Sequence, residues 1–310
     1  MSDTLAVDKR RVRRAFERAA ADYDAAAVMQ NEVCRRMLAR LEYIRVDPAT
    51  ILDAGSGTGN AVAGLLVRYP GARVVALDLA LAMARRARAR RPRPTLSTVD
   101  GLVLSIVEGW RALLGDGGKR LAAVCGDVEQ LPLAPASAGM IWSNLTLQWC
   151  NEPRRAFAEM HRVLAPGGLL MFSTFGPDTL KELRAAFGSV DRHTHVHRFI
   201  DMHDLGDALV ACGFADPVMD MEMLTLTYAG LRELMRDLKA IGAHNATLGR
   251  PATLTGKSLL AKVAQNYEAA RRDGRLPATF EVIYGHAWKP QPRVGPTGRP
   301  VIEIKPRSGA

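Results

Sequence analysis

Short apolar runs alternate with amphipathic segments along most of the chain, and this alternation predicts an α/β fold. Buried strands are expected where apolar residues run together, at 49–55, 73–79, 120–125, 138–144, 169–175 and 279–290. Helices are expected where apolar residues recur every three or four positions, at 9–42 with a break near Tyr23, 60–70, 80–90, 153–164, 177–188, 202–213 and 230–242. This spacing predicts a mostly parallel, doubly wound sheet with helices on both faces.

Three segments depart from the alternation. Residues 92–119 contain two prolines and the sequence GDGG around a short apolar stretch, and we expect them to be an insertion. Residues 216–228 are expected to form a pair of strands. Residues 291–310 are expected to be a loose tail.

Length and composition limit the class of protein. A chain of 310 residues with 48% hydrophobic residues can form one large core. It has no run of the roughly 18 to 20 apolar residues that would cross a bilayer, so we expect no membrane partner. The N-terminus lacks the apolar region of a secretory signal and contains several acids, which mitochondrial presequences avoid. These features predict a cytoplasmic protein.

The net charge of +10 indicates an acidic partner. The excess is concentrated in DKRRVRR at 8–14 and RRARARRPRPT at 85–95, although solvated helix faces would also explain such clusters. No aromatic residues interleave with the arginines as stacking platforms, which disfavours nucleic acid. An acidic carrier protein fits the charge equally well.

The stretch ILDAGSGTGN at 51–60 predicts a nucleoside site at the end of the first strand. Gly55, Gly57 and Gly59 lack side chains where a ligand must approach the backbone. Asp78 ends the second strand about 20 residues further on, where a carboxylate accepts hydrogen bonds from ribose hydroxyls.

Two details favour S-adenosylmethionine over a dinucleotide. The dinucleotide fingerprint G-x-G-x-x-G/A is not met, because Asn60 stands where its third small residue should fall. Asp53 also places a carboxylate beside the loop, which disfavours a pyrophosphate and favours a cation. S-adenosylmethionine carries a ribose, an ammonium and a sulfonium.

A third acid completes the pattern. Asp127 follows the third strand, where its carboxylate can accept from an adenine amino group while Val128 packs on the ring. Taken in series, the strand-end residues resemble the motifs of class I methyltransferases, which implies a Rossmann-like fold and S-adenosylmethionine as cofactor. The predicted cofactor-binding residues are Asp53, Gly55, Ser56, Gly57, Gly59, Asp78, Leu79, Asp127, Val128, Asn144 and Leu145.

Four longer segments resemble a narrower family, the malonyl-acyl carrier protein O-methyltransferases of biotin synthesis. They are AFERAAADYDAAAVMQ at 15–30, the run from WSNLTLQWC to DTLKEL at 142–183, HVHRF at 195–199, and LKAIGAHNATLGR at 238–250. The resemblance implies a malonyl group on an acyl carrier protein, or malonyl-coenzyme A, as substrate. It also implies that Tyr23, Arg198 and Phe199 contact this substrate.

The same resemblance implies how the chain is divided. Residues 1–45 would form a helical lid and substrate segment, and residues 46–176 the cofactor-binding core. Residues 177–290 would complete the sheet and bind the substrate, followed by the tail at 291–310. We expect a monomer.

This reaction needs no general base, because a carboxylate is already ionised at neutral pH. It needs alignment of the reacting atoms and exclusion of water. It also needs no metal. His193, His195 and His197 would share one face of a strand, but no local carboxylate or cysteine completes a metal site.

Two other functions stay open. FGPDTLKELRAAF, ELMRDLKAIGAHNA and PATFEVIYGHAWK are also similar to a mitochondrial complex I assembly factor of the same superfamily, a protein arginine hydroxylase. A noncatalytic nucleic-acid-binding module would fit the basic charge, but it leaves Asp53, Asp78 and Asp127 unexplained.

Overall fold

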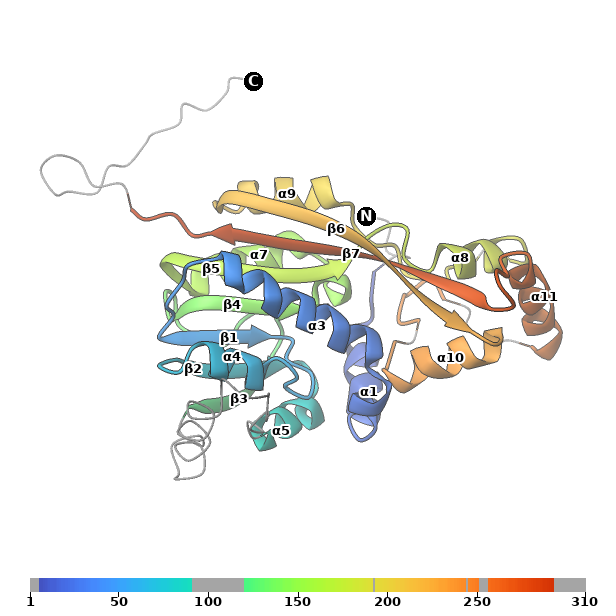
Figure 1. Ribbon diagram of the computed structural model, residues 1–310, viewed down its shortest axis with the longest axis horizontal. Coiled ribbons are helices and arrows are strands. Elements are labelled where there is room, and N and C mark those ends of the chain that lie inside the picture. Colours follow the sequence, from blue (N-terminus) through green and yellow to red (C-terminus); the bar gives the residue numbers. More distant parts are fainter. Residues whose placement is uncertain (1–5, 91–119, 192, 244, 251–255, 293–310) are drawn as a thin grey trace, which may run out of the picture.

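The computed structural model describes residues 6–90, 120–191, 193–243, 245–250 and 256–292. Its centre is a seven-stranded sheet in the order β3-β2-β1-β4-β5-β7-β6 (Figure 1). The strands are β1 (Thr50–Ala54), β2 (Arg73–Asp78), β3 (Leu121–Cys125), β4 (Ala138–Asn144), β5 (Leu164–Phe175), β6 (Ala215–Tyr228) and β7 (Leu276–Trp288). The insertion predicted at 92–119 and most of the predicted tail lie outside the described residues.

Strands β1 to β5 pair in parallel, whereas β7 runs antiparallel to both β5 and β6. The helices of the described residues are α1 (Lys9–Ala19), α2 (Tyr23–Ala26), α3 (Val28–Arg40), α4 (Val62–Arg68), α5 (Leu81–Ala89), α7 (Pro153–Val163), α8 (Lys181–Gly188), α9 (Met202–Ala211), α10 (Leu231–Ala240) and α11 (Lys257–Glu268). The predicted mostly parallel α/β sheet is therefore confirmed. Among these helices, none is long and apolar enough to pass through a bilayer.

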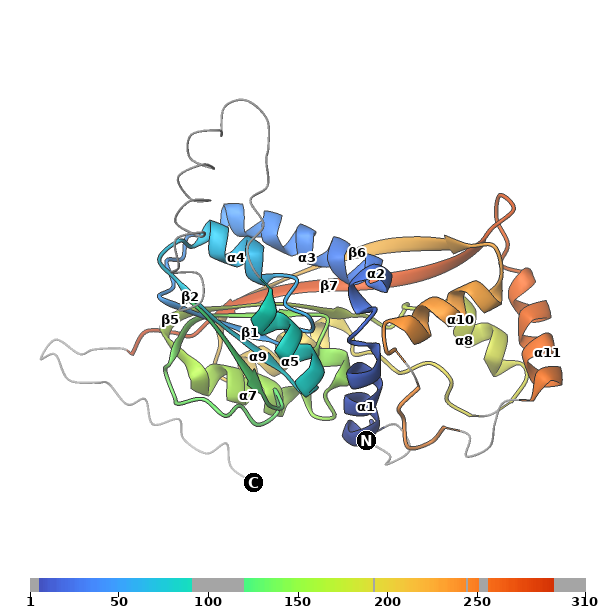
Figure 2. The ribbon, with the colours of Figure 1, turned by 90° about the horizontal axis from the view of Figure 1, so that it is seen from below.

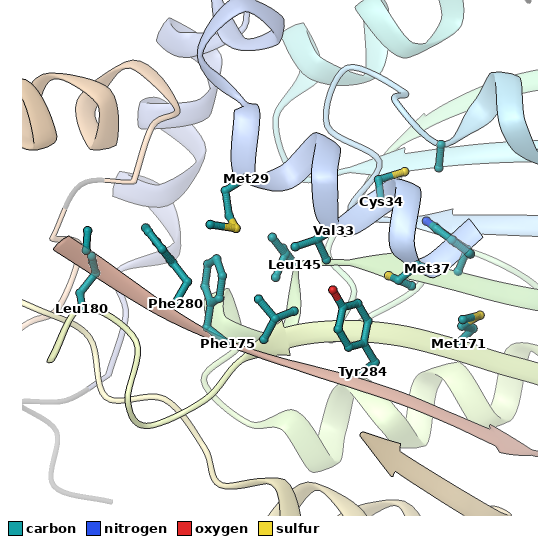
Figure 3. Packing of buried hydrophobic residues seen from close by; sticks show 14 of the residues in the cluster. Met29, Val33, Cys34, Met37, Leu145, Met171, Phe175, Leu180, Phe280 and Tyr284 are labelled. Carbon is teal, nitrogen blue, oxygen red and sulfur yellow. The ribbon is translucent and has the colours of Figure 1, made fainter. Parts of the chain in front are cut away.

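Helices cover both faces of the sheet and form two main cores. Helices α3 and α4 bury their apolar residues in one core, and α7 and α9 bury theirs in the other. On the first face, Met29, Val33 and Met37 project from successive turns of α3 toward the sheet (Figure 3). This spacing of three or four residues is the one that the sequence pattern predicted for a helix packed on a sheet.

Strands β6 and β7 form an arm that extends beyond the rest of the sheet (Figures 1 and 2). Strand β5 pairs only with the Val282–Trp288 part of β7, so the preceding residues of β7 pair with β6 alone. Tyr267 of α11 donates to the carbonyl of Pro277 at 2.7 Å, which fastens that helix to the arm. The arm thus holds α8, α10 and α11 beside the carboxyl ends of the parallel strands.

Three sequence predictions differ from the structure. Residues 216–228, predicted as a pair of strands, form the single strand β6, whose partner β7 lies some fifty residues later in the chain. Helix α11 was not predicted. Strand β5 begins at Leu164 and includes the APGG segment that was expected to be the loop before it.

Candidate active site

The loop after β1 contains three glycines with positive φ, at 81° for Gly55, 54° for Gly57 and 83° for Gly59. A side chain at Gly55 would collide with Thr146, and a Cβ at Gly59 would lie 2.9 Å from the Cα of Ala87. A Cβ at Gly57 would meet only the Cε1 atom of Tyr23, at 3.8 Å. Two of the glycines therefore serve close packing within the protein, and Gly57 is the one that leaves room above the loop.

Asp78, at the end of β2, holds this loop in place. One carboxylate oxygen accepts from the backbone N–H of Gly57 at 2.9 Å, and the other accepts from that of Ala80 at 2.8 Å. Burial raises the pKa of Asp78 to about 6, although these two hydrogen bonds lower it. Each carboxylate oxygen has a second lone pair, so Asp78 can still accept bonds from ribose hydroxyls.

Asp53 is a buried acid that forms no ion pair with any described residue. The residue is 2% exposed, and its Oδ2 atom has no hydrogen-bond partner among the described residues. Burial, reinforced by the charge of Asp78, raises the pKa of Asp53 to about 8. Ser56 Oγ and Gln30 Oε1 are also buried and have no hydrogen-bond partner among the described residues. Two buried acceptors without donors fit a ligand that brings N–H groups and positive charge.

The N-terminal segment covers the glycine loop. Tyr23 begins α2, and its ring lies next to Gly57. Burial, together with the charges of Asp78 and Asp24, raises the pKa of the Tyr23 phenol well above its ordinary value. Asp24 contacts the Thr58 hydroxyl, which ties this segment to the loop. Tyr23 is therefore a neutral phenol that shields the space above Gly57.

Helix α1 contacts the segments that follow β2 and β3. Glu17 accepts from the backbone N–H groups of Leu81 and Ala82, at 2.7 and 3.0 Å, and so caps the start of α5. Lys9 donates to both oxygens of Asp127, at 2.8 and 3.0 Å, and pairs with Glu129. Asp127, predicted to accept from adenine, is thus bound by a lysine, while Val128 is buried in the core.

Asn144 and Leu145 lie where β4 ends. Asn144 accepts from the hydroxyl of Ser173 at 2.8 Å and donates to the carbonyl of Gln30 at 3.1 Å, which links the strand end to α3. Leu145 has a positive φ of 49°, unusual for a residue with a branched side chain. Its side chain projects toward Met29 and Phe175 (Figure 3).

A cavity of about 900 Å³ opens beside these residues. Tyr23, Gln30 and Leu145 line it near the strand ends, and Met235 and Leu260 line it on the arm side. Most of its wall is apolar, including Met29, Phe175, Leu180 and Phe280 (Figure 3). The cavity connects the covered glycine loop to the helices of the arm.

The two other predicted substrate residues lie in different surroundings. Phe199 lines the large cavity and packs against Phe175, with ring centroids 5.8 Å apart. Arg198 is exposed and lines a small neighbouring pocket instead. The structure therefore brings Tyr23 and Phe199 to one cavity but does not bring Arg198 to it.

The three histidines do not lie on a strand. His195 pairs with Asp191 at 2.9 Å, a carboxylate that the sequence analysis overlooked, and stacks on Phe187. His197 packs edge-to-face on Trp149, and burial lowers its pKa to about 4. In the described part of the chain, no group of three potential metal ligands comes together.

Sequence reasoning missed Lys9, Glu17 and Gln30. Lys9 was considered only as part of a basic cluster and Glu17 only as one of the N-terminal acids, because nothing in their spacing shows which loop they reach. For Gln30 the available signal was its place in the AFERAAADYDAAAVMQ segment, which resembles the family. Their contacts depend on how α1 and α3 cross the edge of the sheet.

The sheet order, the glycine loop and the acids at the strand ends define a methyltransferase of class I. Residues 52–172 match the family described as "Methyltransferase domain". A putative methyltransferase from Bacillus halodurans C-125 has the same fold, with a TM-score of 0.52, 18% identity, and coverage of 82% of this chain and 99% of that one. The YcgJ protein of Bacillus subtilis gives a TM-score of 0.54 at 15% identity, covering 84% and 99%.

Sequence relatives then identify the particular family. The chain is 55% identical to a malonyl-[acyl-carrier protein] O-methyltransferase of Gallionella capsiferriformans, over 96% of each chain. It is 57% identical to one of Nitrosospira multiformis, over 93% of this chain and 91% of that one. A relative of the same name from Methylovorus is 52% identical over 100% and 99%. The chain belongs to the malonyl-[acyl-carrier protein] O-methyltransferase family.

Proposed function

We propose that the protein transfers a methyl group from S-adenosylmethionine to the free carboxylate of a malonyl group, held as a thioester on an acyl carrier protein. The product is a methyl ester, which would prime pimeloyl synthesis for biotin. Family membership supports this reaction over arginine hydroxylation and over noncatalytic binding of nucleic acid. Malonyl-coenzyme A is the smaller alternative substrate.

The observation that carries the proposal is the set of buried acceptors around the glycine loop. Asp53 Oδ2 and Gln30 Oε1 have no donors among the described residues, and Asp78 lies nearby with lone pairs to spare. A pyrophosphate would bring more negative charge to this place, which Coulomb repulsion opposes. An ammonium satisfies the acceptors and a ribose satisfies Asp78, so the residues fit S-adenosylmethionine.

When bound, S-adenosylmethionine supplies an electrophilic methyl group on a sulfonium. The chain then has to orient a carboxylate that is already ionised and keep water away from it. Tyr23 is neutral and lies next to Gly57, so its phenolic O–H can donate a hydrogen bond to the malonyl carboxylate and orient it. Leu145 and the apolar wall exclude water.

Phe199 would cover the acyl chain, because it lines the same cavity as Tyr23. Arg198 was predicted to contact the substrate, but its exposed position outside that cavity favours Tyr23 as the residue that holds the carboxylate. We retain Asn144 and Leu145 as the residues that face the methyl donor. The protein would act as a monomer in the cytoplasm, with neither nucleic acid nor membrane as partner.

The test is to incubate the protein with methyl-labelled S-adenosylmethionine and malonyl-carrier protein, and to search the product for a methyl ester by mass spectrometry. Acetyl-carrier protein, which lacks the free carboxylate, is the matched control. We expect label on the malonyl substrate alone. Label on both carriers, or a hydroxylated arginine on a partner protein with no ester, would contradict the proposal.

A further inference from the structure

We propose that the carrier protein docks on a basic surface formed by the exposed faces of α10 and α1, at the outer end of the cavity. We call it the docking face and define it by Arg14, Arg18, Arg232, Arg236 and Lys239. This inference depends on the proposed function, since it places the carrier protein that delivers the malonyl group.

The shape of the substrate determines where the carrier must lie. A malonyl group on a carrier protein sits at the end of a long linear arm, which joins the protein through a phosphate. The cavity has its reaction end at Tyr23 and Leu145, and its opposite wall includes Met235, Lys239 and Leu260. Met235 is 38% exposed and Leu260 is 37% exposed, so this wall reaches the surface. The carrier therefore belongs at the arm-side end.

Helix α10 presents cations at that end. Arg232, Arg236 and Lys239 are exposed and lie four and three residues apart, so they share one face of the helix with Met235. Lys239 also lines the cavity, where an ammonium can bind the phosphate of the arm. Of the acids on this helix, Glu233 accepts from the backbone N–H of Ala229, and Asp237 is exposed.

Helix α1 lies next to α10 and adds two more exposed arginines near this end of the cavity. A Cβ at Gly242, which follows α10, would lie 3.2 Å from the Phe16 ring and 3.4 Å from Ala19, so α1 and the end of α10 are in contact. Both views show the two helices next to each other (Figures 1 and 2). Arg14 and Arg18 are exposed and are one helical turn apart on α1.

These cations differ from many others in the protein in having no structural task. Arg36 and Arg40 pair with acids of β6, and Arg162 binds Glu159 and two carbonyls. Within the described residues, the side chains of the docking face make no ion pair and no hydrogen bond. Unpaired charge of one sign around a substrate entrance speeds and orients the approach of an oppositely charged partner. A small acidic protein is the complementary partner.

The experiment compares two substrates with the same reacting end. Malonyl-carrier protein is expected to contact the docking face. Malonyl-pantetheine has the same arm without the phosphate and the carrier protein, so it is not expected to contact this face. In the double variant Arg232→Glu/Arg236→Glu, we expect KM for malonyl-carrier protein to rise at least tenfold. The KM for malonyl-pantetheine should change less than twofold, because neither arginine lines the cavity.

The matched control is Arg45→Glu/Arg73→Glu. It makes the same change in charge at two exposed positions, and Arg73 lies at the amino end of β2, whereas the site lies at the carboxyl ends of the parallel strands. We expect it to leave both KM values within twofold. Thermal unfolding of all variants verifies that they are folded.

Equal effects of Arg232→Glu/Arg236→Glu on the two substrates, or equal effects of both double variants on the carrier substrate, would overturn the docking face. So would an unchanged KM for the carrier substrate. If the wild-type protein methylates neither substrate, the proposed function fails instead. The two failures are therefore distinguishable.

Discussion

At the scale of single residues, the site contains buried acids, and burial makes their ionised form unfavourable in the absence of a cation. Burial raises the pKa of both Asp53 and Asp78, which lie at the ends of adjacent strands, and the charge of Asp78 raises that of Asp53 further. Removing a carboxylate from water costs free energy unless a partner compensates for the lost solvation. The proposed cationic ligand would supply that partner, so the feature that destabilises the free protein would favour the complex.

We expect the free protein to become more stable as the pH falls from 8 to 6. The folded-state pKa of Asp53 is raised to about 8, above the ordinary value of about 3.9 in the unfolded chain. In this range the native state binds a proton that the unfolded state does not, so stability rises with acidity. Denaturant unfolding at pH 6 and 8 measures the effect, which we expect to be about 2 kcal/mol from Asp53.

The variant Asp53→Asn isolates that contribution, because it removes the titrating group and keeps a similar shape. Its stability should depend on pH less steeply than that of the wild-type protein. The same slope in both proteins would mean that Asp53 is ionised in the folded state and that another group causes the dependence.

The glycines allow a second residue-scale prediction. A methyl group at Gly55 must displace Thr146 as well as adopt a positive φ, so Gly55→Ala should lower the free energy of unfolding by roughly 2 to 5 kcal/mol. At Gly57 the methyl group meets only Tyr23, and Gly57→Ala should cost about 1 to 2 kcal/mol.

Gly57→Ala, although the less destabilising of the two changes, should weaken binding of the nucleoside. The Gly57 methyl group projects into the space above the loop, so calorimetry with S-adenosylhomocysteine should show weaker binding to Gly57→Ala than to the wild-type protein. Undiminished affinity would mean that the nucleoside does not approach Gly57.

At the scale of elements, α1 is held by polar contacts with two loops as well as by a modest apolar interface that includes Phe16. Only Val12 and Ala15 are buried on this helix, whereas Glu17 caps α5 and Lys9 binds the loop after β3. Hydrogen bonds to charged groups are stronger than those between neutral groups. The helix can therefore cover the site without a large apolar interface.

We expect Lys9→Met to loosen α1. The change removes the partner of Asp127 and Glu129 and should lower the opening free energy of the helix by roughly 1 to 3 kcal/mol. Hydrogen exchange of the α1 amides measures this directly. The neighbouring variant Arg10→Met removes an exposed cation whose side chain has no partner in the described chain, and should leave exchange nearly unchanged. Identical exchange in the two variants would show that Lys9 does not fasten the helix.

The elements of the central sheet were predictable because each carries its own local pattern. The runs at β1, β2 and β4 are short, apolar and ended by polar or small residues. Strand β6 was divided wrongly because its 14 residues exceed the usual strand length and its pairing with β7 is not encoded locally. Helix α11 has apolar residues at helical spacing, including Val263 and Tyr267, so its signal was present but overlooked.

At the scale of the whole molecule, the site combines segments that are far apart in the sequence. The parallel strands supply the acids and the glycine loop, the N-terminal helices cover them, and the β6–β7 arm supplies the far wall of the cavity. Asp53, Gly57 and Asp78 could be predicted because strand ends meet at one edge of a parallel sheet. The position of Arg198 and the contacts of Lys9 and Glu17 could not, because they depend on how remote elements cross.

The central claim is that a cationic nucleoside lies over the first two strand ends, with its reactive end toward the cavity. A crystal structure of the protein with S-adenosylhomocysteine tests it most directly. We expect the ribose hydroxyls on Asp78, the ammonium near Asp53 and Gln30, and the sulfur facing the cavity beside Tyr23 and Leu145. A nucleoside bound elsewhere, or bound here with its sulfur turned away from the cavity, would contradict the account.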